Sequence, residues 1–318
     1  WLGSYFDGLA RMNKQTGTCQ DATSLLQGNL NAGKPKVSCI IEDKNKNLWV
    51  GTYGSGLYKI NLPTQHVTYY ESTRNENDDW SINRLPNDWI SYLLEDKEGM
   101  IWIGTYKGLA VLNPQTDNFI NYKKQNNLLP GYVVYSLLES RNGEIWAGTS
   151  EGLVCLNKDR LTPVLFTTAD GRPSDIICGL AEDEKKNIWI STHQGISKLN
   201  PPEKKFINYY AGDGLQGNEF TRTAVFNDKR GKIFFGGTNG VTAFYPQDIT
   251  EIKKEMNVLI TGFHVANRPV KKGDKSGNNV ITDTAVMDTE QFTLAYNENT
   301  FSIDFSVLEF SNPDRISY

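Results

Sequence analysis

A short sequence unit recurs along this chain and constrains its fold more than any other feature. The unit reads Trp-x-Gly-Thr or a close variant, and its six aromatic positions are Trp1, Trp49, Trp102, Trp146, Trp189 and Phe234. These positions lie 43 to 53 residues apart, which is the length of a four-stranded β-propeller blade. The repeat therefore predicts an all-β fold built from propeller blades, the first of them incomplete.

Each unit predicts the same order of strands and turns. An apolar run such as 90–95 comes first, and a polar turn that opens with Asp or Ser follows it. Such a side chain can accept hydrogen bonds from the amides of its own turn, and the aromatic residue stands six positions later. We interpret the repeated Trp as packing between neighbouring blades. The Asp turns lack the dense oxygen pattern of a calcium loop, so we interpret them as caps.

Composition excludes several classes of protein. The chain has 318 residues and a formal net charge of −4, which argues against binding nucleic acid, because that requires clustered Lys and Arg. The sequence contains no run of 18 consecutive apolar residues, so it predicts no membrane-spanning helix. The four cysteines show no metal-ligand spacing, and Cys39, Cys155 and Cys178 lie in apolar runs, as small core residues do.

Three stretches resemble a known family. Residues 48–57, Leu-Trp-Val-Gly-Thr-x-x-x-Gly-Leu, are similar to the two-component regulator propeller repeat. Residues 213–220 with 234–244 look like the last blade of such propellers. Residues 258–263 with 296–305 resemble the β-sandwich, the Y_Y_Y domain, that follows them. The resemblance implies the periplasmic sensor region of a Bacteroides-type hybrid two-component histidine kinase.

That resemblance sets further expectations. It implies blades of the seven-bladed type over 1–250, incomplete in this chain, and the start of an Ig-like β-sandwich over 251–318. It also implies sensing of oligosaccharides to control polysaccharide-utilisation genes, a homodimer formed through the sensor region, and placement as the periplasmic part of an inner-membrane protein. Membrane contact would come only through a helix downstream of this segment.

Candidate ligand contacts follow from position within the blade. Propellers bind at the channel mouth, where the loops between second and third strands meet the loops between blades. Aromatic faces there could stack on sugar rings, and Arg, Lys, His and amides could bind hydroxyl or acidic groups. The candidates are Tyr53, Arg84, Trp89, Tyr106, Lys107, Glu151, His193, Gln194, Asn218, Arg222 and Asn239. Trp80 and Tyr132 lie in the same interblade loops.

Two alternatives stay open. A propeller lyase or hydrolase would act at the same mouth, but of the three histidines only His193 falls in a suitable loop. No nucleophile elbow, phosphate loop or zinc-binding helix appears. We therefore expect no catalytic residues, no metal and no cofactor in this region. The second alternative is a structural propeller that only scaffolds a ligand site elsewhere.

Overall fold

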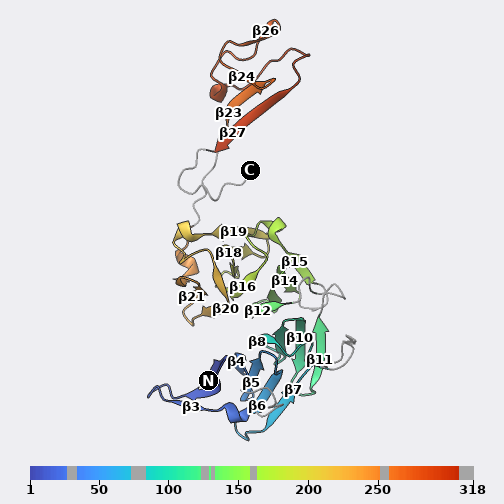
Figure 1. Cartoon of the computed structure of the whole chain (residues 1–318), viewed down its shortest axis with the longest axis vertical. Coiled ribbons are helices and arrows are strands. Elements are labelled where there is room, and N and C mark those ends of the chain that lie inside the picture. The colour runs from blue at the N-terminus through green and yellow to red at the C-terminus, as the bar shows by residue number, and fades with distance from the viewer. Residues whose placement is uncertain are drawn as a thin grey trace. The chain divides into compact units, whose positions relative to one another are not determined.

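The computed structural model describes residues 1–26, 34–72, 84–122, 129, 133–157, 163–250 and 258–307. The chain divides into two compact units, Trp1–Ile249 and Thr250–Tyr318. Figure 1 shows the first unit as a succession of small antiparallel sheets, from blue to yellow along the chain. No helix in this described part is long and apolar enough to cross a membrane.

The first unit consists of six blades, which we number 1 to 6 in chain order. Blade 1 has three strands, β1 (Leu2–Ser4), β2 (Gly8–Met12) and β3 (Cys19–Asp21). Blade 2 has β4 (Val37–Glu42), β5 (Asn47–Thr52), β6 (Leu57–Asn61) and β7 (Val67–Tyr70). Blade 3 has β8 (Ile90–Glu95), β9 (Ile101–Thr105), β10 (Gly108–Asn113) and β11 (Asn118–Tyr122).

The remaining blades repeat this order. Blade 4 has β12 (Val134–Glu139), β13 (Ile145–Thr149), β14 (Leu153–Leu156) and β15 (Pro163–Phe166). Blade 5 has β16 (Ile177–Glu182), β17 (Ile188–Thr192), β18 (Gly195–Asn200) and β19 (Lys205–Tyr209). Blade 6 has β20 (Phe220–Asn227), β21 (Ile233–Gly237) and β22 (Gly240–Phe244). The all-β propeller-blade fold predicted from the repeat is therefore confirmed.

In blades 2, 3 and 5 the Asp of the turn caps that turn and also binds the repeated Trp. In blade 3, Asp96 accepts backbone N–H groups of Glu98 and Met100 at 3.0 and 2.9 Å. Its other carboxylate oxygen accepts the Trp102 indole N–H at 2.8 Å. Asp43 and Asp183 make the same bond to their own tryptophans. One residue type thus fixes the hairpin and orients the indole.

The repeated Trp packs between blades, as the repeat predicted. Trp102 is fully buried and shares a core cluster with Val134, Leu137 and Ile145 of the following blade. On its other side it stacks on Tyr122 of its own fourth strand, with ring centroids 5.9 Å apart. Full burial of so large a side chain stabilises the fold by several kcal/mol, on the order of 3.

A glycine two positions after the Trp lets neighbouring blades approach closely. A Cβ added at Gly148 would lie 2.4 Å from Ile177 Cγ2 in the first strand of the next blade. Gly51 meets Ile90 in the same way at 2.7 Å. The first strands β4, β8, β12, β16 and β20 contact one another in chain order. The repeat therefore keeps glycine there because a side chain would separate the blades.

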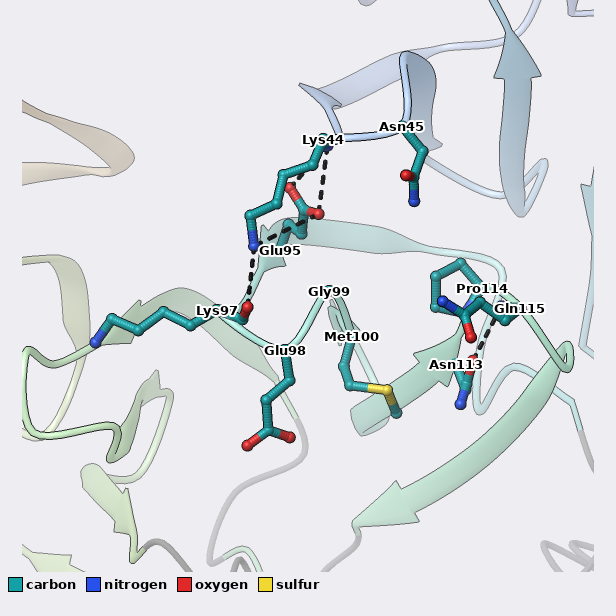
Figure 2. A pocket seen from close by; sticks show the side chains of 10 residues that line it. All are labelled: Lys44, Asn45, Glu95, Lys97, Glu98, Gly99, Met100, Asn113, Pro114 and Gln115. Atoms are coloured by element: carbon teal, nitrogen blue, oxygen red, sulfur yellow. Dashed lines mark hydrogen bonds and ion pairs between the residues drawn. The ribbon is translucent and has the colours of Figure 1, made fainter.

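A belt of charged residues joins the turns of successive blades at the end of the blade where first and second strands meet. Glu95 ends β8 and accepts the backbone N–H of Lys44 from the preceding turn at 3.2 Å. The Lys44 ammonium reaches forward to the carbonyl of Asp96 at 2.9 Å and to that of Lys97 at 3.2 Å, and Figure 2 shows the bond to Lys97. Glu139 with Lys97, and Glu182 with Arg141, repeat the arrangement.

The last step of this belt differs from the earlier ones at both positions. Glu184 stands where the earlier turns carry Lys or Arg, and Asn227 stands where the earlier strands end in Glu. Asn227 donates its amide to the Glu182 carbonyl at 3.0 Å. Two facing carboxylates are thereby avoided at the interface of blades 5 and 6, because like charges at this separation repel.

The second unit is a smaller β structure. Its strand β23 (Val258–Val265) pairs with β24 (Arg268–Pro269) and with β27 (Phe301–Val307). A separate pair is formed by β25 (Lys275–Ser276) and β26 (Asn279–Val280). Phe263 stacks on Phe292 with ring centroids 4.1 Å apart, inside a small core. The expectation that this unit begins an Ig-like sandwich of the Y_Y_Y type stays a prediction.

Candidate ligand-binding site

The loops between second and third strands are held rigidly at one end of every complete blade. Thr105 donates its hydroxyl to the Gly108 carbonyl at 2.8 Å and accepts the Lys107 backbone N–H at 3.1 Å. Thr52, Thr149 and Thr192 repeat both bonds. Gly108 has a φ of 128°, which a residue with a Cβ rarely adopts. These hydrogen bonds therefore fix the backbone of the loops that carry the tip side chains.

Four aromatic side chains from three blades meet at this end of the propeller. We name Tyr5, Tyr53, Trp89 and Tyr106 the mouth cluster. Ring centroids of Tyr53 lie 5.8 Å from Tyr5, 6.1 Å from Trp89 and 6.0 Å from Tyr106. Trp89 and Tyr106 are 5.5 Å apart. Most of these contacts are edge-to-face, a favoured geometry for aromatic rings.

Backbone bonds hold the mouth cluster in place. Tyr53 and Trp89 form an isolated β-bridge, and the Tyr106 backbone N–H donates to the Trp89 carbonyl at 3.1 Å. Trp89 directly precedes the first strand β8, and it is 49% exposed. A large aromatic residue held rigidly but left half in solvent is typical of a recognition surface.

The hydroxyl of Tyr53 stays protonated at neutral pH. Burial raises the pKa of Tyr53 to about 12, and the neighbouring Tyr106 adds to the effect. The phenol can therefore donate a hydrogen bond to a ligand oxygen as well as accept one. Lys36 adds a cation at the rim, because its ammonium lies 4.6 Å from the Tyr5 ring centroid and 3.2 Å from the Tyr5 hydroxyl.

Three residues of this surface were missed from the sequence. Tyr5 follows the first repeat copy as Tyr53 follows the second, so the positional rule that selected Tyr53 could have found it. Lys36 lies just before β4, and its carbonyl accepts the Tyr53 backbone N–H at 2.9 Å. Tyr135 lies inside β12, a first strand, so the search among loop residues could not reach it.

Two predicted residues have structural contacts in the interblade loops. Asn218 accepts the Ala211 backbone N–H through its side chain at 2.7 Å, and its carbonyl accepts the Gly195 N–H at 2.6 Å. Asp175 occupies the equivalent place in the preceding loop, where it accepts the Thr168 N–H at 2.8 Å. The carbonyl of Arg84 accepts the side-chain amide of Asn121 on the fourth strand β11. These bonds place Arg84 beside an outer strand.

The other candidates lie at the loop tips or in β20. Lys107, Glu151, Gln194 and Asn239 are exposed at the tips, His193 is half-buried beside Gln194, and Arg222 is exposed in β20. The structure thus brings Tyr53, Trp89 and Tyr106 into direct mutual contact. Trp80 and Tyr132 lie outside the described residues.

Three of the four cysteine thiols are held in an inert, protonated form. Burial raises the pKa of the Cys39, Cys155 and Cys178 thiols to about 12 in each case, so all three are protonated at neutral pH. The Cys178 thiol donates to the Phe220 carbonyl at 3.3 Å. Within the described ranges, no group of three His, Cys, Asp or Glu side chains could hold a metal ion.

Comparison with known proteins agrees with the repeat. The family model described as "Two component regulator propeller" matches residues 33–54, 84–107 and 128–151, which lead into and include the first two strands of blades 2, 3 and 4. A protein named histidine kinase P4 from Formosa agariphila is 27% identical over 282 residues. That match covers 87% of this chain and 20% of the relative, so the chain spans about a fifth of the relative's length.

Comparison with solved structures shows which known proteins share the fold of this chain. The extracellular domain of a putative hybrid two-component system from B. thetaiotaomicron is similar with a TM-score of 0.72 and 25% identity. The match covers 98% of this chain and 40% of that one. A catalytically inactive virginiamycin B lyase from Staphylococcus aureus, solved with quinupristin, has a TM-score of 0.51 and 12% identity, over 76% of this chain and 78% of that one. The lyase shares the fold alone.

The three lines of comparison point the same way. The repeat model, the histidine kinase relative and the extracellular-domain structure all connect this chain to two-component signalling proteins. Residues 33–54, 84–107 and 128–151 are two-component regulator propeller repeats, and 98% of the chain is similar in fold to the extracellular domain of a putative hybrid two-component system.

Proposed function

We propose that this chain is part of the extracytoplasmic sensor region of a hybrid two-component histidine kinase, and that its mouth cluster binds an oligosaccharide. The observation that carries the ligand site is the mutual contact of Tyr53, Trp89 and Tyr106, in which Trp89 is 49% exposed. Aromatic faces bind the apolar faces of sugar rings, and the Tyr53 hydroxyl and Lys36 can bind sugar oxygens. The region itself performs no catalysis in this account.

The signalling part of the proposal follows the relatives. The sensor would sit in the periplasm, attached to the inner membrane by a helix downstream of this segment, and would act as a homodimer. It would control genes for polysaccharide use. The ligand must then bind one arrangement of the domains or of the dimer more tightly than the other, because only a difference in affinity can shift such an equilibrium.

Replacing Trp89 by alanine is expected to weaken oligosaccharide binding at least about tenfold, which corresponds to roughly 1.4 kcal/mol. The variant removes the central exposed face of the mouth cluster while the buried tryptophans stay in place. Calorimetric titration of the 318-residue chain with a panel of plant and host oligosaccharides measures the change.

Tyr296→Ala is the matched control, because Tyr296 is an aromatic residue of the second unit that is 97% exposed. The control should leave the affinity unchanged, and equal melting temperatures should show that both variants are folded. An unaltered affinity in Trp89→Ala would move the site elsewhere. No binding across the whole panel would favour the alternative in which these blades only scaffold a distant site.

A further inference from the structure

The first strand of blade 6 departs from the other blades at the mouth. In blades 2 to 5 the register between first and second strands slips by one residue at the same place, and the unpaired residues are Ser38, Ser91, Tyr135 and Cys178. In blade 6 the register passes from Phe220↔Gly237 to Val225↔Phe235. Four residues of β20 therefore face the single residue Gly236.

This enlarged bulge bends the backbone sharply. Thr223 takes a φ of 64°, which β-branched residues adopt rarely and only with backbone strain. Such strain persists only where the surrounding fold enforces it. The residue just before Thr223 is Arg222, whose side chain is exposed.

The Arg222 side chain reaches past one whole blade. Its guanidinium carbon lies 4.4 Å from the ring centroid of Tyr135, the bulge residue of β12 in blade 4. Blade 5 stands between the two in chain order, and its own bulge residue, Cys178, is buried and bonded to the Phe220 carbonyl. Strands β12 and β20 come into contact there. Arg222 therefore lies over the inner strands rather than in a peripheral loop.

The Tyr135 ring connects Arg222 with the mouth cluster. Tyr135 is only 7% exposed, and the Arg222 guanidinium lies over its ring. Burial raises the pKa of Tyr135, the positive charge of Arg222 opposes that shift, and the nearby Tyr106 adds to it. Strand β12, which carries Tyr135, also contacts β9, and Tyr106 follows the last residue of β9. Tyr106 is a member of the mouth cluster.

The guanidinium is available for a ligand. Across the described ranges, the Arg222 guanidinium lies over the Tyr135 ring and no described carboxylate forms an ion pair with it. A guanidinium stacked by its face on an aromatic ring keeps its N–H edges free, and these edges match carboxylate and sulfate oxygens in pairs. Lys36 and Lys107 are exposed at the same end of the blades and add positive charge.

We infer that the oligosaccharide bound at this mouth carries an acidic group, a carboxylate or a sulfate, which Arg222 binds while a neighbouring sugar ring stacks on the mouth cluster. This inference rests on the proposed function and narrows its ligand class. Tyr135 is then a positioning residue, since it holds the guanidinium plane without touching the ligand. The enlarged bulge of β20 places the Arg222 guanidinium over Tyr135.

The test is calorimetric titration of the whole chain with length-matched neutral, uronate-containing and sulfated oligosaccharides. Wild-type protein is expected to bind one acidic class at least about tenfold more tightly than the neutral one, as charge-assisted bonds would produce. Arg222→Gln should remove that preference and leave neutral binding unchanged, whereas Arg222→Lys should keep part of it. The acidic class that binds with the higher affinity identifies the acidic group as a carboxylate or a sulfate.

Arg230→Gln is the matched control. Arg230 is also an exposed arginine of blade 6, but it lies in the turn at the opposite end of the blade and pairs with Asp228. This variant should keep the preference. Equal affinity of wild-type protein for neutral and acidic sugars, or a preference that survives in Arg222→Gln, would overturn the inference and leave the proposed function standing. Absence of binding to every class would overturn both.

Discussion

Replacing Asp96 by alanine is expected to lower the free energy of unfolding by about 3–5 kcal/mol. Asp96 accepts three hydrogen bonds, two from the amides of its turn and one from the indole of Trp102. The indole is fully buried, so its N–H would lose a strong charge-assisted partner where water cannot replace it. Urea unfolding followed by tryptophan fluorescence measures the loss.

Blade 4 provides a natural control for this prediction. Ser140 replaces Asp there, and the Trp146 indole N–H has no partner within the described part of the chain. Ser140 still accepts the Glu144 backbone N–H at 3.1 Å. Ser140→Ala should therefore cost less than half as much as Asp96→Ala. An equal loss in the two variants would show that the indole bond contributes little.

Introducing the missing Asp into the turn of blade 4 tests the same hydrogen bond in the opposite direction. In blades 2 and 5 the fifth turn residue is Asn47 or Asn187, whose side chain donates to the Asp of its turn at 2.8 and 2.9 Å. Blade 4 has Glu144 at this position, so a single Ser140→Asp would place two carboxylates together. The double variant Ser140→Asp/Glu144→Asn should instead stabilise the chain by about 1 kcal/mol.

Replacing Gly148 by alanine is expected to destabilise the chain by about 3 kcal/mol. The added methyl would lie 2.4 Å from Ile177 Cγ2 and 2.9 Å from Ile177 Cβ. Both atoms belong to the first strand of the next blade, which is itself packed on both faces, so relief requires the blades to separate. Thermal denaturation measures the effect, and the double variant Gly148→Ala/Ile177→Ala should lose less than the sum of the single variants.

Gly217→Ala is the matched control, because its nearest neighbour would be the mobile end of the Asn239 side chain at 3.2 Å. That variant should change the melting temperature little. Blade 5 shows how the fold itself accommodates a side chain at the close approach. Ser191 replaces the glycine of the repeat there, and its cross-strand partner is Gly179. Purely additive losses in the double variant would contradict the steric account.

The blade framework could be predicted because its sequence unit occurs six times in the chain. A residue that recurs at one place in every copy has a role that every copy shares, and the Trp and Asp positions proved structural for that reason. The same comparison selected Tyr53 and Tyr106 at loop tips, where the copies differ. Tyr5 follows the first copy as Tyr53 follows the second, so the same rule applied to the first copy would have selected it.

Other parts of the site depend on tertiary geometry that no local pattern encodes. Arg222 was selected as a loop residue, but its position over Tyr135 depends on a bulge three residues longer than the single unpaired residue of blade 4. Asn218 was predicted as a ligand contact, and in the structure it forms hydrogen bonds to Ala211 and Gly195. Side chains with several possible partners can be assigned only when the backbone places those partners.

The most direct test of the account is fluorine NMR of the chain labelled with 5-fluorotryptophan, recorded with and without an oligosaccharide identified by calorimetry. The seven tryptophans give separate signals, and Trp89→Phe assigns the one that matters. Saturating ligand should shift the Trp89 signal and leave those of the buried Trp49, Trp102, Trp146 and Trp189 unmoved. Binding that leaves the Trp89 signal in place would contradict a ligand site at the mouth cluster.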